Sequence, residues 1–149
     1  MDLGRLGEEC RRFKEIYDNC TAHSLLLLNE TFSTTSFEEG YFIARDAVRA
    51  LLTKNIRTIY NTHMHKLARE IDELNTSVEK EVASLSSDAQ TSRPENDKPL
   101  RTAKAASLVA VSDGHDRSFR VCVMPPEGRS YAEDIAVKYG VTFDLLTKE

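Results

Sequence analysis

Two short predicted strands separated by an amphipathic helical pattern constrain the fold more than any other feature of this sequence. Leu25–Leu28 is an unbroken apolar run, which is typical of a parallel strand covered on both faces, and Ile56–Tyr60 is predicted as a second buried strand. Between them, Ser36 followed by Glu39 fits a capping box and predicts a helix start. The apolar stripe of that helix is Ile43, Ala44, Ala47, Val48, Leu51 and Leu52. Strand, helix and strand in succession predict a right-handed βαβ unit with parallel strands.

Further elements are predicted on both sides of this unit. Apolar residues recur at helical spacing from Leu3 to Cys20, and a second helix is expected after His63. The stripe of the second helix is Leu67, Ile71, Leu74, Val78, Val82 and Leu85. We expect this stripe to fold onto its own domain, with a partner surface as the alternative. Residues 86–106 are polar with two prolines and predict a flexible loop.

The C-terminal third predicts an antiparallel hairpin followed by short helices. Ser107–Val111 and Ser118–Val123 flank the turn signal Asp113-Gly114. Ser130 with Glu133 repeats the capping-box pattern, and Gly140 is placed to end the helix that follows. The apolar face of that helix is Ile135, Ala136 and Tyr139. Altogether we predict an α/β fold whose mixed sheet is parallel in its first half and closed by an antiparallel hairpin.

Composition excludes several classes of function. The chain has 149 residues and a net charge of -4, which argues against binding nucleic acid through a basic surface. No apolar run is long enough to span a bilayer, and the N-terminus lacks the apolar core of a signal peptide, so we expect a cytoplasmic protein without a membrane partner. Three cysteines without CxxC spacing predict reduced thiols, and Cys10 and Cys20 are most simply small core residues.

Polar side chains stand at the predicted carboxyl ends of both parallel strands. Asn29 and Glu30 follow the first strand, and His63 follows the second. Ligands of open α/β sheets collect at this edge. There a glutamate can orient water for attack on a phosphate, and a histidine can stabilise charge that develops on the phosphate. The alternative is structural: Glu30 caps a turn and His63 merely ends a strand.

Four segments in order resemble the ATPase domain of the MutS family of DNA mismatch-repair proteins. SLLLLNETFSTTSFEEG resembles the Walker B strand and the loop after it, with Thr35, Ser36 and Gly40 at the family spacing. IRTIYNTHMHKLA resembles the next strand and its Thr-His switch, matched by Thr62 and His63. GRLGEECRRFKEI resembles the signature segment, with its acidic residue at Glu9, and MPPEGRSYAEDIAVKYGV resembles the last strand exit and helix. The segment LLNETF is more similar to the MutS-related branch of the family than to the member that recognises mismatches.

The resemblance implies a fold, cofactors and site residues. The fold would be of the P-loop NTPase, ABC-like type. ATP and Mg²⁺ would bind between two such domains in a dimer, while other domains of the full protein engage DNA. Glu30 would activate the hydrolytic water, His63 would be the switch, and Asn29 with Glu30 would hold magnesium through water. Nucleotide contacts would come from Asn29, Thr35, Ser36, Gly4 and Arg5.

This sequence departs from the family pattern in three places. Asn29 replaces the usual aspartate, and Gly4 with Arg5 replaces the Ser-Thr of the signature. The sequence contains no GxxxxGK[ST] phosphate loop. We therefore interpret residues 1–149 as the C-terminal half of an ATPase domain, an excised segment that is inactive alone. The rival hypotheses are a non-enzymatic dimerisation module with a degenerate nucleotide site and a general ABC-type ATPase.

Two smaller groups of residues have simple explanations. His63 and His65, with Cys20 or His23, suggest a metal site only weakly because no carboxylate partner is evident. A basic cluster of Arg11, Arg12 and Lys14 is interleaved with glutamates and is best explained as a solvated helix face.

Overall fold

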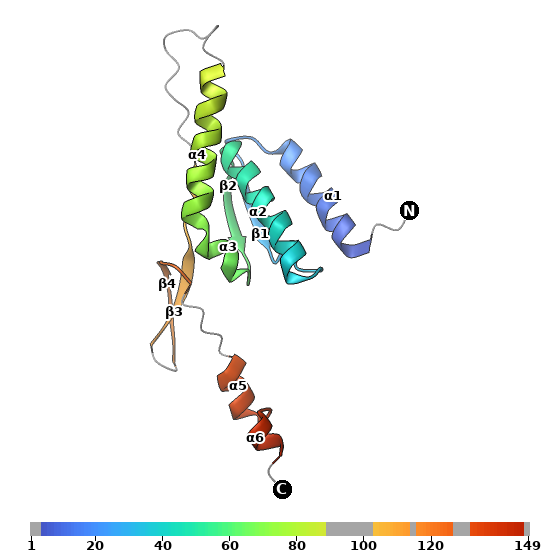
Figure 1. Ribbon diagram of the computed structural model, residues 1–149, viewed down its shortest axis with the longest axis vertical. Helices are drawn as coiled ribbons and strands as arrows, with labels where there is room; N and C mark the ends of the chain where they lie inside the picture. Colours follow the sequence, from blue (N-terminus) through green and yellow to red (C-terminus); the bar gives the residue numbers. More distant parts are fainter. Residues whose placement is uncertain (1–3, 89–102, 114–115, 127–131, 148–149) are drawn as a thin grey trace.

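The structure, a computed structural model, describes residues 4–88, 103–113, 116–126 and 132–147 (Figure 1). Its centre is a βαβ unit, as the sequence predicts. β1 (Leu25–Asn29) and β2 (Arg57–Asn61) pair in parallel, with Leu25 opposite Arg57 and Asn29 opposite Asn61. α2 (Phe37–Thr53) connects them and begins at its N-cap, Ser36, whose hydroxyl accepts the Glu39 amide.

Two helices cover only one face of this pair of strands. α1 (Gly4–Asn19) and α2 both pack against Leu26 and Leu28, which are buried. On the opposite face Leu25 is 57% exposed and Leu27 is 67% exposed. The expectation that this strand is covered on both faces is therefore wrong for the described residues. The unbroken apolar run reflects a second apolar face that no described element of the chain covers.

The helix predicted after His63 is divided into two. α3 (His65–Arg69) ends at Glu70, and α4 (Ile71–Asp88) begins directly after it. The Glu70 carboxylate accepts a hydrogen bond from the Tyr41 hydroxyl of α2. A tertiary contact is thus made at the residue where the two helices separate. No glycine or proline stands at this position, so the sequence does not indicate that the helix is divided here.

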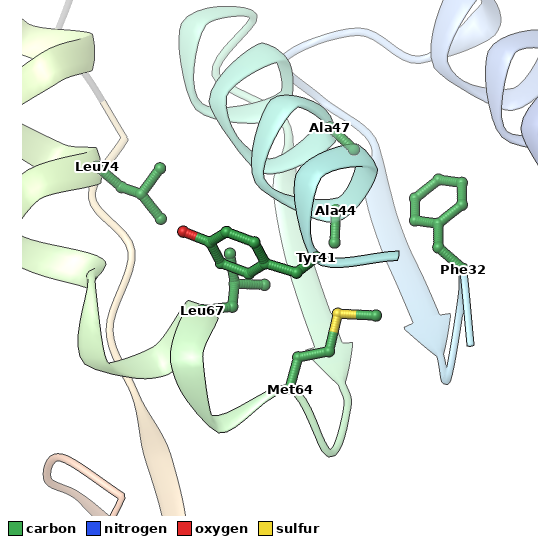
Figure 2. Packing of buried hydrophobic residues seen from close by; sticks show 7 residues of the cluster. All are labelled: Phe32, Tyr41, Ala44, Ala47, Met64, Leu67 and Leu74. Carbon is green, nitrogen blue, oxygen red and sulfur yellow. The ribbon is translucent and has the colours of Figure 1, made fainter. Parts of the chain in front are cut away.

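The main core lies between α2 and the two helices that follow β2. Figure 2 shows its side chains converging from α2, from α3 and α4, and from the loop after β1. Its buried members are Phe32, Tyr41, Ala44, Ala47, Met64, Leu67 and Leu74. Val78 continues the buried stripe of α4, whereas Leu85 near the end of the helix is 63% exposed. The first half of the predicted stripe therefore folds onto its own domain.

β3 (Leu108–Asp113) and β4 (Asp116–Val123) form the predicted antiparallel hairpin. Val111 lies opposite Arg120, whereas Ser112 lies opposite Arg117, so the register shifts and β4 carries a bulge. Phe119 lies in this bulge with φ 56° and is 90% exposed. In the described residues the hairpin is a separate two-stranded sheet, not part of one mixed sheet with β1 and β2. The single mixed sheet is a wrong prediction here, because no described strand joins β2 to β3.

The segment predicted as a loop is only partly described. Its first residues continue α4 to Asp88, and residues 89–102 lie outside the described part. At its other end, the side chain of Asn75 forms hydrogen bonds of 3.0 and 2.8 Å with the backbone of Ala105. The end of this segment is therefore tied to α4.

Two short helices close the chain, α5 (Ala132–Lys138) and α6 (Phe143–Leu146). Gly140 has φ 72° and ends the first of them, as predicted. The capping residue expected at Ser130 lies outside the described residues. Ile135 and Tyr139, the predicted apolar face, are exposed, and both helices extend away from the βαβ unit in Figure 1.

Candidate functional site

The carboxyl ends of β1 and β2 lie side by side and bring their polar residues together. The Asn61 side chain donates a hydrogen bond of 2.7 Å to Oδ1 of Asn29. The Glu30 amide donates to the Asn61 carbonyl at 2.9 Å, which extends the ladder by one residue. This edge is where open α/β sheets collect ligands.

Glu30 and His63 approach each other at this edge. Oε1 of Glu30 lies 3.4 Å from Nε2 of His63, a contact that becomes an ion pair when the imidazole is protonated. The Glu30 side chain is 33% exposed, whereas the His63 side chain is 91% exposed. One carboxylate and one imidazole are thus available to a ligand from solvent, and together they can orient water or hold and release a proton.

The loop after β1 has an unusual backbone. Glu30 has φ 50° and Phe32 has φ 68°, a left-handed conformation that costs a residue with a side chain about 1–3 kcal/mol. Three contacts compensate for this cost. The Tyr60 hydroxyl donates to the Thr31 carbonyl, the Ser33 amide donates to the Glu30 carbonyl at 3.2 Å, and the Phe32 ring is 1% exposed. The loop is therefore fixed by tertiary contacts rather than by local preference.

Gly40 allows α2 to pack against this loop. A Cβ atom at this position would lie 2.4 Å from the Phe32 carbonyl oxygen and 3.2 Å from the Met64 methyl group. The first of these contacts is with backbone and cannot be relieved by a side-chain rotation. Only glycine therefore fits between the helix and the loop in this arrangement.

Thr35 and Ser36, predicted to contact nucleotide, are engaged at the start of α2. Ser36 is the N-cap, and the Thr35 hydroxyl donates to the Glu39 carboxylate. Hydrogen bonds from Thr35 and then Ser36 hold the pKa of Glu39 below its ordinary value. The structure places both hydroxyls beside the loop that carries Glu30, within a helix-capping arrangement.

α1 reaches the same loop through two contacts. Glu9 accepts a hydrogen bond of 3.0 Å from the Thr34 hydroxyl. The rings of Phe13 and Phe32 meet edge to face, with centroids 5.4 Å apart. Gly4 and Arg5 lie in the first turn of this helix, before Glu9.

The residues present fit part of a site for magnesium and ATP. Magnesium favours one or two carboxylates, phosphate oxygens and several waters. Glu30 provides one carboxylate, while Oδ1 of Asn29 already accepts the Asn61 amide. Within the described ranges, no group of three or more histidine, cysteine, aspartate or glutamate side chains could hold a metal ion. These residues can hold a hydrated magnesium ion only if phosphate oxygens of a nucleotide complete the site. The sequence contains no phosphate loop that would bind those oxygens.

Several residues that shape this site were not predicted from the sequence. They are Phe32, Thr34, Tyr60 and Asn61. Asn61 could have been found, because it is the register partner of Asn29 once the parallel strands are aligned. Phe32 and Tyr60 could not, since an aromatic residue beside an apolar run is ordinarily core.

The other candidate sites are not supported by the geometry. All three cysteines are free. As expected, Cys10 packs against the main core, and Cys20 packs against a second core cluster, which is formed by Leu26, Leu28, Leu51 and Ile56. Arg11 pairs with Glu15, and Lys14 with Asp18, each four residues apart on the exposed face of α1. Among the helices described, none is long and apolar enough to cross a membrane.

Comparisons with known proteins agree with the arrangement of these elements. The family model for MutS domain V matches residues 4–111, which include α1, the βαβ unit and the site at its edge. The endonuclease MutS2 of Thermus thermophilus is 32% identical over 66 residues. That alignment covers 44% of this chain and 9% of the Thermus protein, so the chain spans only a small part of that relative's length.

Proposed function

The chain belongs to the MutS domain V family, and we propose that it is the C-terminal part of an ATP-hydrolysing domain in a MutS-like DNA-processing protein. The observation that carries this proposal is the approach of Glu30 and His63, 3.4 Å apart at the ends of the parallel strands. In this proposal Glu30 orients and deprotonates the attacking water. His63, which follows the next strand, contacts the terminal phosphate of ATP and also contacts the Glu30 carboxylate, so that it links the two groups. Magnesium, when bound, neutralises charge on the phosphates.

The half-domain proposal is supported by the uncovered face of the central strands. Leu25, Leu27 and Ile59 point away from α1 and α2, and each is more than half exposed. An apolar sheet face of this kind is normally covered in an α/β domain. We propose that a segment bearing the phosphate loop covers it in a longer polypeptide. Sequencing the gene upstream of the codon for Asp2 tests this: a phosphate loop in the same reading frame supports the proposal, and a stop codon directly upstream contradicts it.

The remaining parts of the proposal follow from family membership. The Glu9 segment at the start of α1 would face the nucleotide of a second MutS-like domain in a dimer, with Gly4 and Arg5 at that contact. DNA would bind to other domains of a cytoplasmic protein. The asparagine at position 29 and the similarity to a MutS2 protein favour assignment of this chain to the MutS-related branch of the family.

Replacement of Glu30 tests the catalytic role directly. In the complete polypeptide, we expect Glu30→Gln to lower ATP turnover by about 100-fold or more, because removal of a positioned general base costs this much. ATP binding should be retained, since the isosteric amide keeps the volume of the carboxylate. Turnover is measured by phosphate release, and binding by calorimetry.

Glu38→Gln is the matched control. Glu38 is exposed in the first turn of α2, and its replacement removes the same charge at a nearby position. It should leave turnover within about twofold of the unmodified protein, as surface substitutions usually have small effects. Equal turnover in Glu30→Gln and Glu38→Gln would remove Glu30 from the catalytic role.

A dimerisation module without nucleotide chemistry is the second candidate. The observation in its favour is the hydrogen bond from Asn61 to Asn29, which occupies the amide oxygen at the position expected to hold magnesium. If the complete polypeptide dimerises but binds no ATP in equilibrium dialysis with magnesium present, this second function replaces the first.

A further inference from the structure

Tyr60 connects the end of β2 to the loop that carries Glu30. Its hydroxyl donates a hydrogen bond to the Thr31 carbonyl, across 29 residues of chain. The ring is half-buried and packs against both core clusters, so the hydroxyl is held in one place. Burial raises the pKa of Tyr60 to about 12, although a hydrogen bond with the Thr62 side chain acts in the opposite direction; the carboxylates of Glu30 and Glu9 add smaller increases. The hydroxyl is a donor at neutral pH.

The Thr31 carbonyl, which accepts this hydrogen bond, lies at the most constrained point of the loop. Thr31 stands between Glu30 and Phe32, the two residues with positive φ. The Phe32 side of the loop is fixed by its buried ring and by the close approach of Gly40. The Tyr60 hydroxyl holds the peptide plane between Thr31 and Phe32, one residue after Glu30. Without this bond, the turn that begins at Glu30 loses one of the contacts that fix it, and Glu30 can relax to negative φ, which turns its carboxylate away from His63.

We propose that Tyr60 is a positioning residue that holds the Glu30 carboxylate in the orientation required for catalysis. This inference rests on the proposed ATPase function and adds a residue that acts through Glu30, without contact to substrate. A small rotation of a catalytic group lowers the rate of the chemical step more than it weakens substrate binding.

The test compares Tyr60→Phe with Tyr17→Phe in the complete polypeptide. Tyr17 is also half-buried, packs against the same second core cluster and donates its hydroxyl to a backbone carbonyl, that of Ala50 at 3.3 Å. Both substitutions thus remove a comparable hydroxyl, but only one of the accepting carbonyls adjoins Glu30. We expect Tyr60→Phe to lower kcat about tenfold with KM for ATP within about twofold, and Tyr17→Phe to leave both unchanged.

The combination with Glu30→Gln shows whether Tyr60 acts through Glu30. If it does, Tyr60→Phe causes no further loss of turnover in the Glu30→Gln background, because the group it positions is already absent. A further tenfold loss in that background would overturn the proposal. Equal kcat values for Tyr60→Phe and Tyr17→Phe would also overturn it.

Hydrogen exchange in the 149-residue chain provides a readout that does not depend on ATP. The Ser33 amide donates to the Glu30 carbonyl, so its exchange reports the loop conformation. Tyr60→Phe should accelerate exchange at Ser33 by about tenfold or more, and Tyr17→Phe should not. Unchanged exchange at Ser33 would overturn the positioning role. An unmodified complete polypeptide without ATPase activity would instead contradict the proposed function, while the exchange result would still decide whether Tyr60 holds the loop.

Discussion

The residues from Gly4 to Asp88 and the described residues between 103 and 147 differ in what stabilises their structures. Every buried apolar side chain of the described chain lies in the first region, between Leu26 and Val78. In the second region the hairpin and short helices are hydrogen-bonded, yet Val123 is 73% exposed and Phe143 is 79% exposed. Apolar residues at helical spacing indicated helices in both regions. Such periodicity predicts which face of a helix is apolar, but it does not predict whether this chain covers that face.

Substitution of two phenylalanines, one in each region, tests this difference most directly and has the largest expected effect on the free energy of unfolding. Phe32 and Phe119 both have positive φ, but Phe32 is buried whereas Phe119 is 90% exposed. Replacement by glycine relieves the same backbone strain at each site, so the difference measures burial. Phe32→Gly should lower the free energy of unfolding by about 3 kcal/mol, whereas Phe119→Gly should raise it by up to about 1 kcal/mol. Urea unfolding followed by circular dichroism measures both values.

The comparison breaks down if Phe119→Gly destabilises the chain as strongly as Phe32→Gly. That result would mean that the hairpin packs its bulge against another part of the molecule in solution. A cooperative loss of the first region alone, with the hairpin signal unchanged, would instead show that the two regions unfold separately.

Substitution of two glycines should give a smaller difference in stability between the two regions. Gly40→Ala places a Cβ atom against the Phe32 carbonyl and should cost about 3 kcal/mol, because neither backbone segment can move freely. Gly140→Ala meets no atom within 4 Å and should cost only about 1 kcal/mol, the penalty for a side chain at φ 72°. Equal changes in the thermal unfolding midpoint of the two variants would show that backbone conformation, not steric contact, determines both costs.

The smallest expected effect is a loss of stability at alkaline pH that arises in the first region. Burial, and then the hydrogen bond with Glu70, raises the pKa of Tyr41 to about 12. Since the pKa in the unfolded chain is about 10, this contribution is complete below pH 10 and declines as the pH rises toward 12. Tyr41→Phe should therefore flatten the decrease in unfolding free energy between about pH 10 and pH 12. An unchanged slope in guanidinium titrations would exclude Tyr41 as its source.

The sequence predicted the central unit well because its signals are local. The N-cap at Ser36 and the succession of strand, helix and strand each depend on a few neighbouring residues. The strand bounds differ from those predicted by a residue or so. The division at Glu70 and the separation of the two sheets were not predictable, because each depends on contacts between distant segments.

The candidate site was predictable only in part for the same reason. Glu30 and His63 were found from their positions after two apolar runs, and the structure brings them together. The left-handed backbone of Glu30 and Phe32 has no sequence signal, since neither residue is glycine. Its causes are the burial of the Phe32 ring, the anchor at Tyr60 and the clearance at Gly40, all of which come from separate elements.

The amide pair formed by Asn29 and Asn61 has a consequence for the response of the site to solution conditions. Both side chains are uncharged at every pH at which the protein is folded, and two aspartates in these positions would repel each other. The bond that joins the two strand ends is therefore insensitive to titration and to ionic strength. A change with pH or salt in the affinity of this edge for a charged ligand would therefore not arise from this amide pair.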